Sequence, residues 1–270
     1  MDVTTVKSLF ENAIQLGFQQ IILTGGNLLK EWSTVRQLAP FFKDIEVYTI
    51  VNLLMLNEDV INEINNIDNL NCIINVPILE EQLDVTSLYK IMALIQQYKR
   101  NTIKYGFQIN AMYHKNINAI HSLITNCRLS SNDYYVEFVG EKYFPIVNHE
   151  LRNYLTKAKL SYPDYQTFYY KKQYNYCMNG SLVIGYDGSV YVCRMMRRKN
   201  YGNIHKQPLY TIIVNKEIQE KWRLTIDQIS PCKDCSLRYA CNECRAFEST
   251  LSGSEHSVAI CRRGNIDYAD

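Results

Sequence analysis

The sequence has no long hydrophobic run. No stretch of about 18 apolar residues occurs, so no segment is expected to span a membrane. The first residues, Met1 to Lys7, lack the apolar core of a secretion signal, and we expect a cytoplasmic protein. The net charge is only +2, whereas proteins that bind nucleic acid concentrate basic residues on one face. We therefore expect neither a membrane nor nucleic acid as a partner.

Histidine is scarce, and cysteine is not. The five histidines are scattered, and no H-E-x-x-H pattern occurs. Seven of the nine cysteines lie in the last third of the chain. In a reducing cytosol such a group points to metal binding, and an odd number fits poorly with a closed set of disulfides. The other two, Cys72 and Cys127, stand alone, and we expect each to be a small buried hydrophobic residue.

The densest motif is C-K-D-C-S-L-R-Y-A-C-N-E-C at residues 232–244. Four thiols lie so close in this sequence that too few residues separate them for a helix or strand. Thiolates held so near to one another need a cation. Three more cysteines flank the motif, namely Cys177, Cys193 and Cys261.

Zinc and iron–sulfur clusters both use such thiols. Zinc sites with two C-x2-C pairs usually separate the pairs by about 12–20 residues. Here only five residues lie between them. Seven thiols also divide more naturally into one complete four-thiolate cluster and one cluster with three. The spacing favours iron–sulfur clusters, and a zinc-stabilised binding module stays open as the alternative.

Helical and strand-like segments alternate through the first 160 residues. The expected strands lie at 20–24, 45–51, 70–76, 102–111 and 134–139. The expected helices lie before Gly17 and at 28–42, 58–67, 84–98, 117–126 and 148–159. Such alternation is typical of parallel strands joined by right-handed crossovers. We predict an α/β fold with five parallel strands, preceded by a helix.

The pattern changes near residue 160. A Tyr-rich polar sequence leads to Cys177, and residues 181–192 alternate around Asp187-Gly188, a pair typical of a β-hairpin turn. Tyr201 to Ile204 is expected to form a turn, and a helix is expected over 209–222. We therefore predict two domains, with bounds 1–165 and 166–270.

The cysteine pattern resembles the SPASM domain, the C-terminal extension of radical S-adenosylmethionine (SAM) enzymes that modify ribosomal peptides. That family has Cys, a spacer, Gly-x4-Cys, then C-x2-C-x5-C-x3-C and a final Cys. Gly188-x4-Cys193 fits this order. So do Cys177, Cys232, Cys235, Cys241 and Cys261. Cys244 comes one residue early, as in a subgroup that accompanies ATP-grasp peptide ligases.

The resemblance implies two auxiliary [4Fe–4S] clusters. An outer cluster would be held by Cys232, Cys235, Cys241 and Cys261. An inner cluster would be held by Cys177, Cys193 and Cys244, which leaves one iron open to a substrate, a water molecule or another side chain.

The N-terminal part resembles the partial (β/α) barrel of radical SAM enzymes. The sequence I-L-T-G-G-N-L-L at 22–29 is similar to the family's Gly-Gly-Glu-Pro segment, whose backbone binds the amino group of SAM. Gly25, Gly26 and Asn27 are the candidate cofactor-binding residues, although Asn27 stands where the family has Glu. The family's C-x3-C-x2-C motif does not occur, and the barrel's first strand has no counterpart. This chain alone is therefore not expected to cleave SAM.

These features predict an iron–sulfur protein of ribosomal-peptide maturation whose auxiliary clusters relay electrons or bind substrate. The expected partners are a precursor peptide, a partner maturase or ATP-grasp ligase, and an electron donor. Two alternatives stay open. In the first alternative, the chain is a fragment of a complete radical SAM/SPASM enzyme. In the second, it is a zinc-stabilised binding module.

Overall fold

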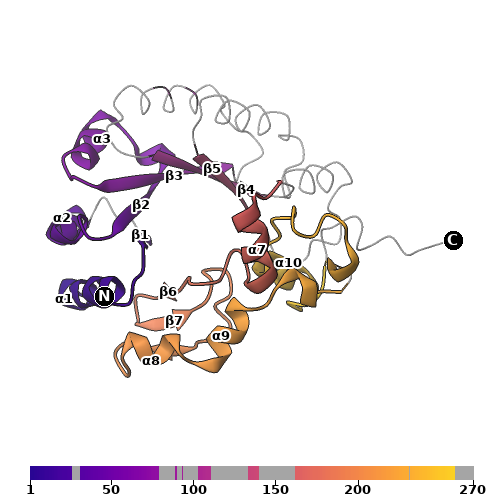
Figure 1. Cartoon of the computed structure of the whole chain (residues 1–270). Helices are drawn as coiled ribbons and strands as arrows, with labels where there is room; N and C mark the ends of the chain where they lie inside the picture. The colour runs from indigo at the N-terminus through magenta and orange to yellow at the C-terminus, as the bar shows by residue number, and fades with distance from the viewer. Residues whose placement is uncertain are drawn as a thin grey trace. The chain divides into compact units, whose positions relative to one another are not determined.

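The computed structural model describes residues 1–25, 31–78, 89, 93, 103–110, 133–139, 162–230 and 232–258 (Figure 1). The chain divides into two compact units, residues 2–140 and residues 141–270. Apart from Tyr89 and Ala93, the helices predicted at 84–98, 117–126 and 148–159 lie outside the described residues. Gly26, Asn27, Cys127 and Cys261 lie outside them as well.

The N-terminal unit is built on a five-stranded sheet in the order β1-β2-β3-β4-β5. Its strands are β1 (Gln20–Leu23), β2 (Glu46–Asn52), β3 (Leu70–Ile78), β4 (Ile103–Asn110) and β5 (Asp133–Val139). Each strand pairs in parallel with the next one along the chain. This confirms the predicted α/β class and the five parallel strands.

Strand β2 carries much of the core of this unit. Val47, Tyr48, Thr49 and Val51 are all buried, and a continuous buried run is typical of a parallel strand covered on both faces. The hydroxyl of Tyr48 donates a hydrogen bond to Glu46 Oε1 at 2.8 Å, so the polar end of this buried ring is satisfied.

Capping side chains begin several of the described helices of the N-terminal unit. These are α1 (Val3–Gln15), α2 (Trp32–Leu38), η1 (Ala39–Phe41), η2 (Leu53–Met55) and α3 (Glu58–Asn65). The Asp2 carboxylate accepts a hydrogen bond from Thr5 N at the start of α1, and Asn57 Oδ1 accepts one from Val60 N in α3. The chain leaves α1 through Gly17, whose φ is +78°.

The C-terminal unit combines short helices with a three-stranded antiparallel sheet in the order β6-β7-β8. The strands are β6 (Val183–Ile184), β7 (Ser189–Tyr191) and β8 (Gly202–Asn203). The helices are α7 (Tyr165–Gln173), α8 (Leu209–Ile213), α9 (Lys216–Trp222), η4 (Ile226–Gln228), η5 (Cys232–Asp234) and α10 (Arg245–Ser252). The hairpin predicted around Asp187-Gly188 is present as β6 and β7.

Two predictions for this unit need correction, and one of its helices was not predicted. The segment 209–222 is two helices, because the side chain of Asn215 accepts a hydrogen bond from Glu217 N and starts a new helix there. Residues 201–204 contain strand β8 in addition to a turn, because Gly202 and Asn203 pair with β7. The Tyr-rich segment before Cys177 forms helix α7, which begins where Asp164 Oδ1 accepts a hydrogen bond from Thr167 N.

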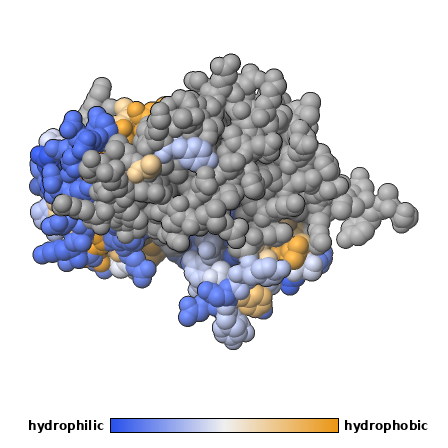
Figure 2. Space-filling model, turned by 90° about the horizontal axis from the view of Figure 1, so that it is seen from above, coloured by the Kyte–Doolittle hydropathy of each residue, from blue (hydrophilic) through white to orange (hydrophobic). Residues whose placement is uncertain are grey.

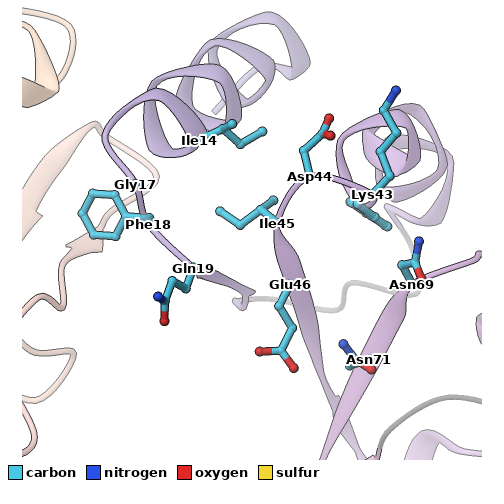
Figure 3. A pocket seen from close by; sticks show the side chains of 11 residues that line it. Ile14, Gly17, Phe18, Gln19, Lys43, Asp44, Ile45, Glu46, Asn69 and Asn71 are labelled. Atoms are coloured by element: carbon cyan, nitrogen blue, oxygen red, sulfur yellow. The ribbon is translucent and has the colours of Figure 1, made fainter.

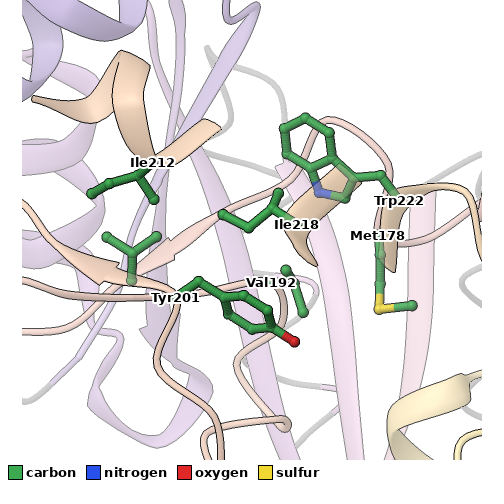
Figure 4. Packing of buried hydrophobic residues seen from close by; sticks show 7 residues of the cluster. Met178, Val192, Tyr201, Ile212, Ile218 and Trp222 are labelled. Atoms are coloured by element: carbon green, nitrogen blue, oxygen red, sulfur yellow. The ribbon is translucent and has the colours of Figure 1, made fainter. Parts of the chain in front are cut away.

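A separate hydrophobic core lies beneath the hairpin (Figure 4). Its buried members are Met178, Val190, Val192, Tyr201, Ile212, Ile218 and Trp222. The indole N–H of Trp222 donates a hydrogen bond to Ser181 O at 3.2 Å. Cys193 is partly buried and packs against this core, so the core fixes the end of the hairpin at which that cysteine lies.

On the face seen in Figure 2, hydrophilic residues predominate among those coloured, with smaller hydrophobic areas between them. None of the helices within the described ranges is long and apolar enough to cross a membrane.

Candidate metal centre

The hairpin turn determines where Cys193 lies. Gly185 O accepts a hydrogen bond from Gly188 N at 3.0 Å, and Gly185 N donates one to Ser189 O at 2.8 Å. This pattern closes a short loop whose last residue, Gly188, has φ of +80°. The Asp187 carboxylate accepts hydrogen bonds from Ser189 N and Ser189 Oγ, and these bonds lower the pKa of Asp187.

Two constraints require glycine at position 188. The left-handed φ disfavours any residue with a Cβ. In addition, a Cβ there would lie 2.4 Å from Cδ2 of His205 and 3.0 Å from Oδ1 of Asn203. The glycine of the Gly-x4-Cys pattern therefore serves both the turn and its packing against β8.

The side chain of Asn175 positions the backbone of Cys177. It is only 4% exposed, and its Oδ1 accepts hydrogen bonds from Cys177 N at 3.1 Å and from Met178 N at 2.9 Å. Its Nδ2 donates to Leu224 O at 3.0 Å, and its backbone N–H donates to Trp222 O at 2.7 Å. One buried amide thus connects the turn that carries Cys177 to the end of α9.

The segment 232–244 is a succession of tight turns. Cys232 O accepts a hydrogen bond from Cys235 N at 3.0 Å, and Cys235 O accepts one from Arg238 N at 3.1 Å. Leu237 O then accepts hydrogen bonds from Ala240 N and Cys241 N, both at 3.0 Å. The segment contains only the single-turn helix η5 and no longer regular element, as its spacing predicts.

Asp227, in η4, holds the middle of this segment. Its Oδ1 accepts a hydrogen bond from Arg238 Nε at 2.9 Å, and its Oδ2 accepts one from the Tyr239 hydroxyl at 2.6 Å. The Arg238 guanidinium also lies 4.7 Å from the centre of the Tyr239 ring. Arg238 Nη1 donates to Cys235 O at 3.2 Å, so the carboxylate fixes the cysteine segment through two neighbouring side chains.

Lys171, near the end of α7, binds the same segment from another side. Its Nζ donates hydrogen bonds to Tyr239 O at 2.9 Å, to Cys241 O at 3.3 Å and to Asn242 Oδ1 at 2.6 Å. The residue is 4% exposed. Burial lowers the pKa of Lys171, while the negative charges of Cys241 and Glu243 raise it.

Cys244 begins helix α10. It is the N-cap residue, and its carbonyl accepts a hydrogen bond from Glu248 N at 2.9 Å. The next residue, Arg245, is buried, pairs through Nε with Glu243, and donates from Nη1 to Glu255 O and Ser257 O at 2.9 and 3.0 Å. These contacts fix the backbone on the C-terminal side of the last cysteine of the motif.

Two of the other predicted cysteines influence Cys177 electrostatically. The pKa of Cys177 is raised to about 11, first by burial of its sulfur and then by the neighbouring Cys244 and Cys193. Although part of the Cys177 residue is exposed, its thiol is desolvated enough to favour the neutral form. The fold therefore brings close together three thiols that lie in separate parts of the sequence.

The seven described cysteines are present as thiols. Six of them belong to the predicted ligand set, namely Cys177, Cys193, Cys232, Cys235, Cys241 and Cys244. Across the described ranges, no three His, Cys, Asp or Glu side chains are arranged to hold a single metal ion. The seventh, Cys72, lies in β3, is 3% exposed, and has its pKa raised to about 12 by burial. This confirms it as a small buried hydrophobic residue.

The candidate SAM turn follows β1. Gly25 lies just beyond the carboxyl end of this strand and has φ of +110°, a conformation that requires glycine. In parallel α/β sheets, ligands bind beyond the carboxyl ends of the strands. The site predicted at Gly25, Gly26 and Asn27 belongs to that edge, although only Gly25 is among the described residues.

A depression of about 790 Å³ lies at the opposite edge of the sheet (Figure 3). Gln19, Glu46 and Asn69 line it at or just before the amino ends of β1, β2 and β3. Ile14 and Ile45 add apolar side chains. Because it lies at the wrong ends of the strands for the predicted cofactor, we do not assign it to the candidate site.

Several residues that shape the cysteine region could not be identified from the sequence. Four of them hold the cysteine region through contacts with residues distant in sequence or through burial, namely Asn175, Asp227, Lys171 and Arg245. Only Asp164, which begins α7 as a capping residue, leaves a local signal.

Comparison with known proteins agrees with the cysteine pattern. Residues 176–236 match the model of SPASM, an iron–sulfur cluster-binding domain. This range includes Cys177, Cys193, Cys232 and Cys235 together with Gly188. A comparison with curated proteins found no match.

The fold is similar to that of SuiB from Streptococcus suis. Compared with SuiB bound to S-adenosylmethionine, the TM-score is 0.60 at 9% identity, over 97% of this chain and 70% of SuiB. Compared with SuiB bound to the precursor peptide SuiA, it is 0.58 at 9% identity, over 97% of this chain and 69% of SuiB. At such low identity the similarity establishes the fold alone.

Proposed function

We propose that this chain, which contains a SPASM iron–sulfur domain, is an iron–sulfur protein of ribosomal-peptide maturation. Its outer [4Fe–4S] cluster is held by Cys232, Cys235, Cys241 and Cys261. Its inner cluster is held by Cys177, Cys193 and Cys244. The observation that supports this assignment best is the electrostatic influence of Cys193 and Cys244 on Cys177, within a region that overlaps the SPASM match.

The residues present fit such clusters in their chemistry. Thiolates are the usual ligands of iron–sulfur clusters, and six of the seven proposed ligands are described as thiols. Buried Nη2 of Arg245, next to Cys244, has no hydrogen-bond partner among the described residues. A buried N–H donor of this kind suits the sulfur of a cluster or of its thiolate ligand.

When bound, the clusters would accept and donate single electrons. The chain's own contribution would be to hold the ligands and to limit access of water to them. Asn175 fixes Cys177, the hairpin core fixes Cys193, and Asp227 with Lys171 fixes the 232–244 segment. With three cysteines, the inner cluster has one iron available to a substrate group.

We propose that the N-terminal unit is part of a (β/α) barrel of radical SAM type. Its support is the sequential parallel sheet with Gly25 beyond the carboxyl end of β1. No C-x3-C-x2-C motif occurs in the 270 residues, so we expect no SAM cleavage from this chain alone. Separate structures show SuiB bound to SAM and SuiB bound to the precursor peptide SuiA. We propose a precursor peptide as the partner of this chain as well.

Anaerobic purification with metal analysis tests this function. Two full clusters predict a brown protein with about eight iron and eight sulfide per chain. Cys235→Ala should lose about half of the iron and of the visible absorption. Cys72→Ala is the matched control, because this thiol lies in the N-terminal sheet, and it should retain both.

Each other result has a clear meaning. Stoichiometric zinc with no visible absorption would replace the proposal with the zinc-stabilised binding module. Equal loss of iron in Cys235→Ala and Cys72→Ala would contradict the assigned ligands. If a precursor peptide binds the iron-loaded protein no more tightly than an unrelated peptide does, the proposal of a precursor peptide as partner is contradicted.

A further inference from the structure

Lys171 is an unusual residue to find inside a protein. A lysine is almost never fully buried unless its charge is compensated, yet this one is 4% exposed. Its neighbour Lys172 is exposed, which is ordinary for a lysine on a short helix. The fold therefore places one of two adjacent lysines against the cysteine segment.

The hydrogen bonds of Lys171 identify its charge state. An ammonium group has three N–H donors, and three oxygens accept from Nζ: Tyr239 O, Cys241 O and Asn242 Oδ1. A neutral amine would have only two donors and would direct its lone pair at the third oxygen. The face of the Tyr176 ring lies 4.7 Å from Nζ and also favours a cation.

The position of this cation relates to one cysteine in particular. Nζ donates a hydrogen bond to the carbonyl oxygen of Cys241 at 3.3 Å, and its other two acceptors are the neighbouring Tyr239 O and Asn242 Oδ1. Coulomb interactions are strongest where water is excluded, and Lys171 is screened from solvent by the residues that bury it. An ammonium group thus lies beside the backbone of Cys241, a proposed ligand of the outer cluster.

We propose that Lys171 is a positioning residue for the outer cluster, whose buried ammonium makes the reduced form of that cluster more stable. The inference depends on the proposed function, since Cys241 is a ligand only there. In the step concerned, the oxidised cluster takes up one electron from dithionite and gains one negative charge. A nearby cation stabilises the product more than the reactant and so raises the reduction potential.

Redox titration of the iron-loaded full-length protein, followed by electron paramagnetic resonance, tests the proposal. Cys177→Ala, measured in parallel, identifies which signal belongs to the inner cluster. Lys171→Met should shift the outer cluster's equilibrium toward the oxidised form at least tenfold, or about 59 mV for a one-electron couple. Lys172→Met is the matched control, because it removes the adjacent exposed charge, and it should leave the potential unchanged.

Further variants separate charge from shape. Lys171→Gln keeps two N–H donors without the charge and should show the same shift. If neither neutral variant loads the outer cluster while Lys171→Arg does, the positive charge is required for assembly, which supports the proposal. Failure of Lys171→Arg as well would show that side-chain shape is what matters, and would overturn it.

The result stays separate from the test of the overall function. A colourless wild-type protein would defeat the proposed function itself. A brown wild-type protein whose potential is the same in Lys171→Met and Lys171→Gln would defeat the inference about Lys171 alone.

Discussion

Asn175 contributes to stability through the hydrogen bonds of its buried side chain. Its amide serves two backbone N–H groups and one carbonyl inside the C-terminal unit. Asn175→Ala would leave these groups without their partner. We expect it to lower the free energy of unfolding of this unit by about 1–3 kcal/mol.

The chain offers a direct measurement of this loss. It has two tryptophans, and Trp222 lies in the core of the C-terminal unit, so urea unfolding followed in a Trp32→Phe background reports that unit alone. Asn179→Ala is the control, because Asn179 makes one side-chain hydrogen bond, to Tyr170, and should cost less, about 0.5–1 kcal/mol. Equal losses would contradict the role given to Asn175.

Arg245 forms a buried ion pair with Glu243. Its side chain is 1% exposed and pairs with Glu243, whose side chain is 12% exposed. Arg245→Met would break the ion pair with the largely buried Glu243 and remove the donor to Glu255 O and Ser257 O. We expect a loss of about 3 kcal/mol in unfolding free energy.

A double variant distinguishes this cause from lost packing. Replacing both partners, in Arg245→Met with Glu243→Gln, removes the buried carboxylate together with its ion-pair partner and should recover part of the stability. If the double variant is as unstable as the sum of the two single variants, the ion pair is not the cause.

Among the elements, the β6–β7 hairpin depends on Gly188. Gly188→Ala should destabilise the C-terminal unit by about 1–2 kcal/mol from its left-handed backbone alone, and by more because the new Cβ would meet His205. Gly253→Ala is the matched control, since Gly253 has the same φ of +80° but open space around it. His205→Ala should then rescue part of the Gly188→Ala loss, and no rescue would rule out the contact.

The elements also show what the sequence can and cannot predict. Strands β1 to β3 follow from hydrophobic runs such as Val47 to Val51, and the hairpin follows from Asp187-Gly188. Helix α7 was not predicted from the sequence, because its aromatic residues do not gather on one face. Its buried residue is Lys171, which a hydrophobic pattern does not identify. The predicted helix 209–222 ignored Asn215, a side chain that can cap a helix as well as continue one.

For the cysteine site, the sequence predicts a set of candidate ligands but not the residues around them. Spacing alone gives the thiols, and the family resemblance gives their division into two clusters. The contacts of Lys171 with Tyr239, Cys241 and Asn242 join residues about 70 positions apart, and no local pattern encodes them. Such long-range polar contacts become visible only when the chain is folded.

In the whole molecule, the two units should respond differently to loss of metal. The N-terminal unit has a hydrophobic core of its own around β2 and β3, including Val47, Leu70 and Val76. The 232–244 segment is held by turns and by a few side chains, so the proposed clusters would supply much of its stability. Anaerobic chelation of iron should therefore loosen this segment while the parallel sheet is unchanged.

Hydrogen exchange followed by mass spectrometry resolves the two responses in one experiment. After chelation, peptides that cover 232–244 should lose their protection, and peptides from β1, β2 and β3 should keep theirs. The hairpin core around Trp222 should lose less, because its seven buried side chains pack without cysteine ligands. Unchanged exchange in 232–244, in a protein shown to have lost its iron, would mean that hydrogen bonds from Asp227 and Lys171 suffice to hold the segment.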